Sequence, residues 1–226
     1  MLIQLIKALT VRLLQRVGLC SWPTKSYEFW MILQMLLYFS KPRTIVEFGS
    51  GRSTHYFAEY ALKKEAKFLS VEQNIFYFLR NRVGLQLAFL PGNVISYVRL
   101  SGVWYSEKKL QKEMDKREID TVEFLFIDGP GGITNPFRHK ETERDVPQCE
   151  AFIQRHASNL QCVIFDDLQR ESVKRLFDRT AATYNMERYV ITRIEPARVY
   201  GFLLPEKSLV ATQFPPPLSS LLTRLE

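Results

Sequence analysis

The sequence predicts a doubly wound α/β fold with a mostly parallel sheet of seven strands and helices on both faces. Short apolar segments rich in β-branched residues alternate, from residue 43 onwards, with segments whose apolar residues have helical spacing. Such alternation requires right-handed crossovers, which cover both faces of a parallel sheet with helices. The last two predicted strands follow each other closely, so we expect them to form an antiparallel pair at the C-terminal end.

The predicted elements follow from these patterns in chain order. The strands cover residues 44–48, 67–73, 93–100, 122–129, 161–167, 189–195 and 199–205. The helices cover residues 26–40, 53–66, 75–84, 106–119, 146–157 and 170–184. The first of these helices is rich in aromatic residues and Met, which predicts a buried helix, and Gly84 is expected to end the third.

The chain is divided here into three parts. Residues 1–40 are predicted to be a helical segment that packs on the core or flanks it. Residues 41–206 form the predicted ligand-binding α/β domain. Residues 207–226 contain the sequence FPPPLSSLL and are predicted to be a Pro-containing tail.

Length and composition are those of one globular domain. The chain has 226 residues, of which 46% are hydrophobic and 24% are charged. Its cysteines, Cys20, Cys149 and Cys162, are far apart and include no CxxC pair. This pattern indicates neither a disulfide framework nor a zinc site, and it favours a cytoplasmic location.

The formal net charge of +7 is concentrated near the N-terminus. Lys7, Arg12, Arg16 and Lys25 all precede the first acid, Glu28, so the first 27 residues carry +4. The remaining charge is scattered and forms no basic stripe with aromatic partners. A nucleic-acid partner is therefore not favoured.

The first 19 residues have the spacing of an amphipathic helix. Apolar residues stand at positions 2, 3, 5, 6, 9, 13, 14 and 17, and the basic residues between them argue against a membrane span or a signal peptide. Two interpretations remain open. The helix packs against the domain or a partner, a second copy of the chain included, or it makes a peripheral contact with an anionic membrane.

Unusual polar residues stand where the predicted strands end. They are Glu47 to Gly51, Glu72, Asp128 and the pair Asp166 and Asp167. Ligands of doubly wound sheets bind beyond the carboxyl ends of the strands, where the strand order changes direction. A functional site is therefore expected at this edge.

The segment VEFGSGRST forms the first strand-to-helix turn. Gly49 and Gly51 allow a ligand to approach the main chain, and Ser53 or Thr54 can cap the following helix. Glu47 would repel a pyrophosphate and attract a cationic ligand. Glu72 follows Gly49 by 23 residues, at the end of the next strand, where a carboxylate can accept both hydroxyl hydrogens of a ribose.

These residues resemble the class I S-adenosylmethionine-dependent methyltransferases. VEFGSG looks like their first motif, and Glu72 looks like the acid that holds the ribose. The resemblance covers residues 43 to about 204 and implies a Rossmann-like fold, with Ser53 in place of the third glycine of the common pattern. It implies that S-adenosylmethionine binds across a set of residues. They are Glu47, Gly49, Ser50, Gly51, Glu72, Gln73 and Asp128, with the adenine near Ser101 and Gly102.

The second half of the chain adds to this resemblance. FLFIDGPGG, followed by VIFDDLQRES, is similar to a set of bacterial methyltransferase-like proteins with DGP-G and DD-x-x-R motifs. The segment after Asp128, DGPGGITNPFRHKETERD, is about 18 residues long. Loops of that length in compact domains are usually functional.

Three carboxylates, Asp128, Asp166 and Asp167, are expected to converge at the site. They could bind a divalent cation such as Mg²⁺ or Ca²⁺, as in catechol-type O-methyltransferases, although those usually place Asn where this chain has a second Asp. Alternatively, Asp128 or Asp167 acts as the general base, with a pKa raised by its neighbours. A purely structural role has Asp166 capping a helix and Arg170 paired with Asp167.

His139 lies in the long segment beside Arg138 and Lys140. It could remove a proton from a substrate hydroxyl, while Arg138 could hold an acidic substrate. Solvation in a polar loop is the alternative for His139.

The resulting hypothesis is a methyltransferase that modifies an oxygen, or less readily a nitrogen, of a small molecule or glycan. The alternative is a cofactor-binding or scaffold protein without catalysis, associated with a membrane surface through residues 1–19. A nicotinamide oxidoreductase is disfavoured, because its turn usually keeps GxGxxG without an acid two residues before the first glycine.

Overall fold

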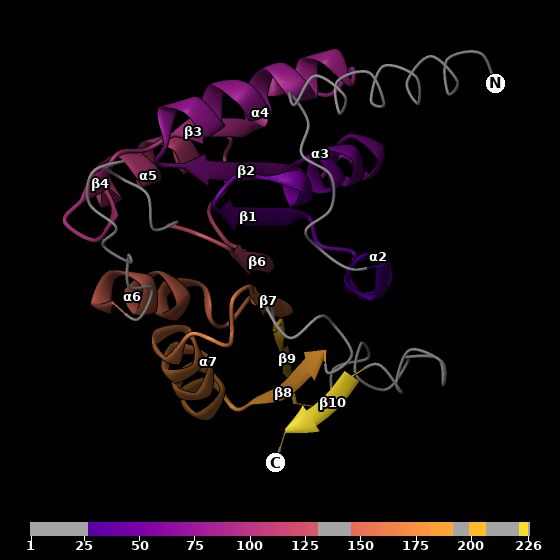
Figure 1. Cartoon of the computed structure of the whole chain (residues 1–226), viewed down its shortest axis with the longest axis vertical. Helices are drawn as coiled ribbons and strands as arrows, with labels where there is room; N and C mark the ends of the chain where they lie inside the picture. Colours follow the sequence, from indigo (N-terminus) through magenta and orange to yellow (C-terminus); the bar gives the residue numbers. More distant parts are fainter. Residues whose placement is uncertain (1–26, 131–145, 192–198, 207–221, 226) are drawn as a thin grey trace.

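The computed structural model describes residues 27–130, 146–191, 199–206 and 222–225. In these residues one eight-stranded sheet is flanked by six α-helices, and a small two-stranded sheet lies beside it (Figure 1). The α/β fold with a mostly parallel sheet and antiparallel C-terminal strands is confirmed.

The sheet has the strand order β10-β8-β9-β7-β6-β1-β2-β3. Its five parallel strands are β1 (Thr44–Phe48), β2 (Lys67–Glu72), β3 (Ile95–Tyr97), β6 (Phe124–Ile127) and β7 (Cys162–Phe165). Its antiparallel strands are β8 (Met186–Ile191), β9 (Gly201–Pro205) and β10 (Leu222–Leu225). The predicted β8–β9 pair forms as expected, with β9 inserted between β7 and β8.

The eighth strand, β10, was not predicted. It pairs antiparallel with β8 and comes from the segment that the sequence indicated only as a tail. Its sequence, LTRL, is only four residues long and contains no turn residue that would mark where a strand begins or ends. Pairing with the edge of an existing sheet, rather than intrinsic propensity, explains the strand.

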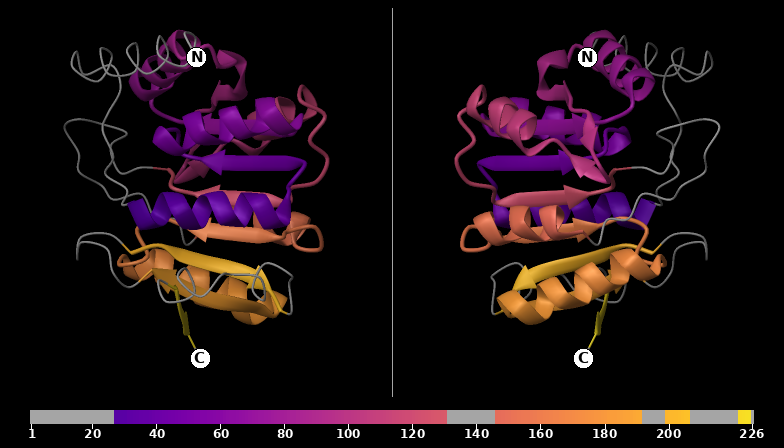
Figure 2. Two further views of the ribbon diagram at one scale, coloured as in Figure 1. Left: turned by 90° about the vertical axis from the view of Figure 1, so that its right-hand side faces the viewer. Right: turned by 90° about the vertical axis from the view of Figure 1, so that its left-hand side faces the viewer.

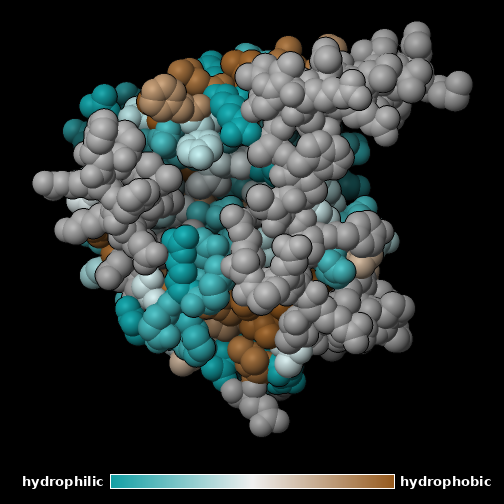
Figure 3. Space-filling view, in the orientation of Figure 1, coloured by the Kyte–Doolittle hydropathy of each residue, from teal (hydrophilic) through white to brown (hydrophobic). Residues whose placement is uncertain are grey.

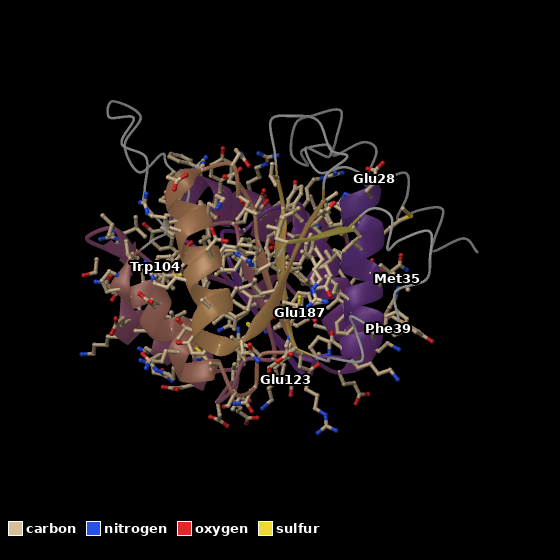
Figure 4. All side chains as sticks on the ribbon, turned by 90° about the horizontal axis from the view of Figure 1, so that it is seen from below. Glu28, Met35, Phe39, Trp104, Glu123 and Glu187 are labelled. Atoms are coloured by element: carbon tan, nitrogen blue, oxygen red, sulfur yellow. The ribbon has the colours of Figure 1, made fainter. Side chains whose placement is uncertain are left out.

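Helices cover both faces of the sheet (Figure 2). One face carries α2 (Tyr27–Ser40), α3 (Arg52–Lys64) and α4 (Ile75–Leu87). The other carries α5 (Glu107–Asp115), α6 (Pro147–His156) and α7 (Glu171–Tyr184). Figure 4 shows this division, with Phe39 of α2 and Trp104 on opposite sides of the sheet.

One helix boundary differs from the prediction. Gly84 does not end α4, because the amide of Ala88 donates to the carbonyl of Gly84 and the helix continues to Leu87. Gly84 is buried inside the helix. Burial against the domain therefore overrides the low helix propensity of glycine.

Helix α2 is part of the core. The ring of Phe29 lies 4.3 Å from that of Tyr200 and 6.1 Å from that of Phe126, both of which belong to the sheet side of the same apolar cluster. The second half of the predicted N-terminal segment therefore packs on the sheet. Residues 1–19, for which a helix is expected, lie outside the described residues.

Within the described part of the chain, no helix is long and apolar enough to cross a membrane. Cys149 and Cys162 are both buried thiols, and neither is in a disulfide. Burial raises the pKa of the Cys162 thiol, so this side chain is uncharged at neutral pH.

Candidate functional site

The strand order changes direction between β1 and β6. From β1 the chain proceeds to β2 and β3 on one side, and later to β6 and β7 on the other. The carboxyl ends of these parallel strands lie at one edge, as Figure 1 shows for β1 and β2. Every acid predicted for the site ends or follows one of these strands, so the edge is the candidate site.

The two glycines of the first turn have different surroundings. Gly49 has φ +89°, and a Cβ there would lie 2.8 Å from the amide nitrogen of Gly129. Gly51 has φ −164°, and a Cβ there would meet no atom of the described residues within 4 Å. Gly49 is therefore required for packing of the turn against the segment after β6, whereas Gly51 borders open space.

Glu47 is completely buried at the end of β1. Its Oε2 atom accepts hydrogen bonds of 2.6 Å from the hydroxyls of Thr54 and Ser70. The Thr54 oxygen in turn accepts a 2.8 Å hydrogen bond from the amide of Gly51. Glu47 thus fixes the glycine turn through Thr54, and its predicted contact with the cofactor stays a prediction.

Glu72 holds the other side of the same turn. Its Oε2 accepts hydrogen bonds from the amide (2.9 Å) and hydroxyl (2.8 Å) of Ser50, and its Oε1 accepts one from the amide of Asn74 (2.8 Å). The side chain is 3% exposed. Burial raises its pKa, and the hydrogen bonds from Asn74 and Ser50 oppose this shift.

Two further side chains support these contacts. The Asn81 amide of α4 donates to the Ser50 hydroxyl at 2.9 Å. The hydroxyl of Tyr105, on β5 (Trp104–Tyr105), donates to Oε1 of Gln73 at 2.9 Å. These bonds connect α4, and the hairpin of β4 (Leu100–Ser101) and β5, to the turn and to the end of β2.

The predicted adenine contact Ser101 lies in β4 (Leu100–Ser101), opposite Trp104. Its side chain is exposed, and the following Gly102 has φ +71°. These residues do follow β3, as the sequence indicated. Their contact with adenine stays a prediction.

Asp128 follows β6 and is half-buried. Its amide donates to the carbonyl of Phe48 at 2.9 Å, which extends the β1–β6 pairing to the site edge. The next residue, Gly129, is buried against Gly49 and the Tyr105 hydroxyl and precedes Pro130 through a cis peptide bond. Asp128 therefore stands at the change in strand direction, beside the glycine turn.

Asp166 and Asp167 form a tight local structure after β7. The Asp166 carboxylate accepts a 2.8 Å hydrogen bond from the Asp167 amide. The Asp167 carboxylate pairs with Arg170 at 3.1 Å, and its backbone has φ +64°. The ion pair between Asp167 and Arg170, which the sequence analysis gave as a purely structural role for Asp167, is thus confirmed.

The predicted metal cluster is wrong for the described residues. No three His, Cys, Asp or Glu side chains among them are grouped as metal ligands. The Asp166 carboxylate instead accepts a hydrogen bond from the Asp167 amide, and the Asp167 carboxylate pairs with Arg170.

Two histidines bear on the candidate site, and one of them, His55, belongs to the described residues. His139, the predicted base, lies outside the described residues. His55 follows the glycine turn on α3, and burial, with a smaller contribution from the charge of Arg52, lowers its pKa to about 4. His55 is therefore neutral at pH 7.

Sequence reasoning missed four residues of this network: Ser70, Asn74, Asn81 and Tyr105. Ser70 had a usable signal, because it is a polar residue in an apolar strand that pairs in register with Glu47. Asn74 had one too, since Asn before an apolar helical segment is typical of an N-cap. Asn81 and Tyr105 reach the site only through tertiary packing.

Comparison with known proteins gives a fold likeness. No family model matches the chain, and no curated protein does. An O-methyltransferase from Bacillus cereus in complex with S-adenosylhomocysteine matches with a TM-score of 0.59 and 13% identity, over 88% of this chain and 90% of that one.

Two other solved structures extend the likeness. The O-methyltransferase TomG from Streptomyces achromogenes, involved in tomaymycin synthesis and bound to S-adenosylmethionine, has a TM-score of 0.56, 12% identity and coverage of 88% and 89% of the two chains. The N-terminal domain of human METTL16 in complex with S-adenosylhomocysteine has a TM-score of 0.54, 14% identity and coverage of 88% and 81%. The chain therefore has the Rossmann-like fold of the S-adenosylmethionine-dependent methyltransferases.

Proposed function

We propose that this chain is an S-adenosylmethionine-dependent methyltransferase whose acceptor is an oxygen of a small molecule or glycan. The observation that carries the proposal is the set of acids at the carboxyl edge of the sheet. Glu47, Glu72, Asp128, Asp166 and Asp167 gather there, although the chain as a whole has a net charge of +7. Such an edge disfavours phosphates and favours a ligand with cationic groups and hydroxyls.

We propose that the Glu72 carboxylate accepts hydrogen bonds from the ribose hydroxyls of the cofactor. Its Oε2 atom already accepts a hydrogen bond from a hydroxyl, that of Ser50. The Ser50 side chain can rotate about one bond and give this position to a ribose hydroxyl, while the Ser50 amide keeps its own bond to the carboxylate. The carboxylate is thus held in place for the exchange by backbone donors on both sides.

Gly51 and the start of α3 form the proposed contact for the amino-acid end of the cofactor. The absence of any atom within 4 Å of a Cβ at Gly51 leaves room for a ligand beside the main chain. The N-terminus of α3 begins at the next residue and favours a carboxylate through its amide groups. Glu47 acts here as a positioning residue, because it fixes Thr54 and so the Gly51 amide.

The proposed chemistry is an in-line displacement at a methyl carbon. S-adenosylmethionine supplies the methyl group from its sulfonium, and the bonding electrons return to sulfur as the new oxygen–carbon bond forms. The chain must align the acceptor and exclude water, which are the main sources of rate enhancement in such a transfer.

Asp128 is the proposed base that takes the proton of the acceptor hydroxyl. It is half-buried beside the glycine turn and follows β6, where the strand order changes direction. The likeness to O-methyltransferases in solved structures supports an oxygen acceptor but does not identify it. His139 is the alternative candidate for this base.

Methyl transfer from labelled S-adenosylmethionine to a panel of phenols, catechols, sugars and amines tests this proposal. We expect transfer to at least one hydroxyl compound, and a fall in kcat of about 10² to 10⁴ in Asp128→Asn, because general-base catalysis is lost. Binding of S-adenosylhomocysteine should fall much less than kcat, because the proposed cofactor contacts with Glu72 and the glycine turn are kept.

The matched control is Asp120→Asn, at an exposed position before β6. It should leave both kcat and cofactor binding unchanged. Cofactor binding without transfer to any acceptor would support the non-catalytic alternative. Equal kcat values for wild type and Asp128→Asn would remove Asp128 from the mechanism.

A further inference from the structure

The outer surface around α4 is unusually apolar. Ten large hydrophobic side chains are exposed in the described residues, and eight of them lie between residues 75 and 103. These eight are Ile75, Phe76, Tyr77, Leu79, Val83, Leu87, Phe89 and Val103. Figure 3 shows apolar atoms along the top of the molecule, over α4. Contiguous exposed apolar surface of this kind marks an interaction site.

Four of these side chains form a stripe along α4, called here the α4 stripe. Phe76, Leu79, Val83 and Leu87 follow helical spacing and are 79%, 50%, 43% and 39% exposed. The opposite side of α4 is apolar too, since Leu85 is completely buried in the core. A helix that is apolar on both sides requires a second apolar environment on its outer face.

The same region carries only positive charge. Between Glu72 and Glu107 the sequence contains no acid, while Arg80, Arg82 and Arg99 give this segment +3. Arg82 and Arg99 are exposed, and Arg80 is half-buried. The apolar surface is therefore surrounded by basic groups and by no carboxylate from its own segment.

Exposed apolar side chains together with arginines favour an anionic lipid surface as the partner. Phenylalanine and leucine side chains enter the boundary between headgroups and acyl chains, while arginines bind lipid phosphates. An anionic surface would be attracted by the arginines near the α4 stripe.

We propose that the α4 stripe and Phe89, with Arg80 and Arg82, form a docking surface for an anionic lipid membrane. The apolar side chains enter the boundary between headgroups and acyl chains, and the arginines bind the lipid phosphates.

Sedimentation of the full-length chain with phospholipid vesicles tests this proposal. We expect binding to vesicles of phosphatidylcholine with phosphatidylglycerol, and binding at least about tenfold weaker to phosphatidylcholine alone. The double variant Phe76→Ser/Leu79→Ser should bind the anionic vesicles at least about tenfold more weakly, because two inserted side chains are lost. Arg80→Gln/Arg82→Gln should reduce the effect of salt on binding.

The matched control is Leu62→Ser/Lys64→Gln on α3. Leu62 is 58% exposed and Lys64 is an exposed base, but neither belongs to the docking surface. This control should bind the vesicles within twofold of the wild type. All three double variants change exposed or half-buried side chains, so circular dichroism should show the same fold for each.

Several outcomes would overturn the proposal. They are failure of the wild type to bind anionic vesicles, and equal binding by the wild type and Phe76→Ser/Leu79→Ser. A lower molecular mass of that variant in light scattering, with unchanged vesicle binding, would assign the stripe to a contact between copies of the chain. A lower unfolding temperature with unchanged vesicle binding would assign it to a contact within the chain.

Discussion

The two sides of the candidate site are built differently. On the β1–β2 side, each carboxylate is bound by hydroxyls from distant parts of the chain, Glu47 by Ser70 across 23 residues and Glu72 by Ser50 across 22. On the β7 side, the described contacts of the acids are local. Asp166 binds the amide of the next residue, and Asp167 pairs with Arg170 three residues later.

This difference suggests that the β1–β2 side is built to bind the cofactor, whereas the acids after β7 have another role. Long-range hydrogen bonds fix the glycine turn in one position, as a pre-organised binding surface requires. The described side-chain contacts of the β7 acids join residues at most three positions apart. We therefore expect substitution of Gly49 or of the acids on the β1–β2 side to change stability and cofactor affinity together, and substitution of Asp167 to change stability less.

The largest expected effect is that of Gly49→Ala. A Cβ at this position would lie 2.8 Å from the Gly129 amide nitrogen, and the backbone has φ +89°. We expect the free energy of unfolding to fall by about 2 to 5 kcal/mol from backbone strain and overpacking together. Urea denaturation measures this loss, which cofactor binding should follow.

Gly51→Ala is the matched control in the same turn. Its Cβ would have no neighbour within 4 Å, so the free energy of unfolding should change by less than about 0.5 kcal/mol. Affinity for S-adenosylhomocysteine should nevertheless fall, because the added methyl group occupies the proposed ligand space. Unchanged affinity in Gly51→Ala would exclude contact between the cofactor and this residue.

Glu47→Gln is expected to have an intermediate effect. It replaces a fully buried carboxylate that accepts hydrogen bonds from Thr54 and Ser70. The free energy of unfolding should fall by about 1 to 3 kcal/mol, the usual range for hydrogen bonds to a charged group. Thermal and urea unfolding check this value, and a stability equal to that of the wild type would show that the turn does not depend on Glu47.

Asp167→Asn should have the smallest effect on stability. The Asp167–Arg170 pair joins a mostly buried carboxylate, 12% exposed, to an arginine that is 35% exposed and therefore open to solvent. Asparagine keeps an oxygen that can accept a hydrogen bond from Arg170, so we expect a loss of about 1 kcal/mol. Asparagine also tolerates the left-handed backbone at φ +64°. A loss of more than about 2 kcal/mol in urea unfolding would contradict the difference between the two sides.

Most of the fold could be predicted from the sequence. The seven expected strands and the six helices expected between residues 26 and 184 have counterparts in the described residues, because periodic segments bounded by turn residues are readily recognised. The strand expected at 93–100 is shorter, at Ile95–Tyr97, and β8 begins at Met186, three residues before the predicted start. The helix expected in residues 1–19 lies outside the described residues. β10 could not be predicted, because a four-residue strand that adds to a sheet edge has no periodic signal of its own. Gly84 was misread as a helix end, because burial, which the local sequence does not reveal, decides its role.

Only the residues of the site that lie in sequence motifs could be predicted, because tertiary packing decides the others. Glu47, Gly49 and Glu72 lie in motifs at strand ends, where topology alone brings them together. The partners of these residues depend on side-chain directions, which no motif encodes, so Asn81 and Tyr105 were missed. The expected metal cluster of Asp128, Asp166 and Asp167 does not occur among the described residues. The left-handed backbone of Asp167 and its ion pair with Arg170 are features that no motif encodes.

Calorimetric titration of S-adenosylhomocysteine into Glu72→Gln tests the central claim most directly. The control is Glu107→Gln, an exposed acid in the first turn of α5. We expect binding by the wild type and by Glu107→Gln, and a Kd raised by about 10- to 100-fold in Glu72→Gln, because one of the two side-chain oxygens that accept hydrogen bonds from the ribose hydroxyls is lost. No binding by the wild type, or equal Kd values for all three proteins, would contradict the proposed cofactor site.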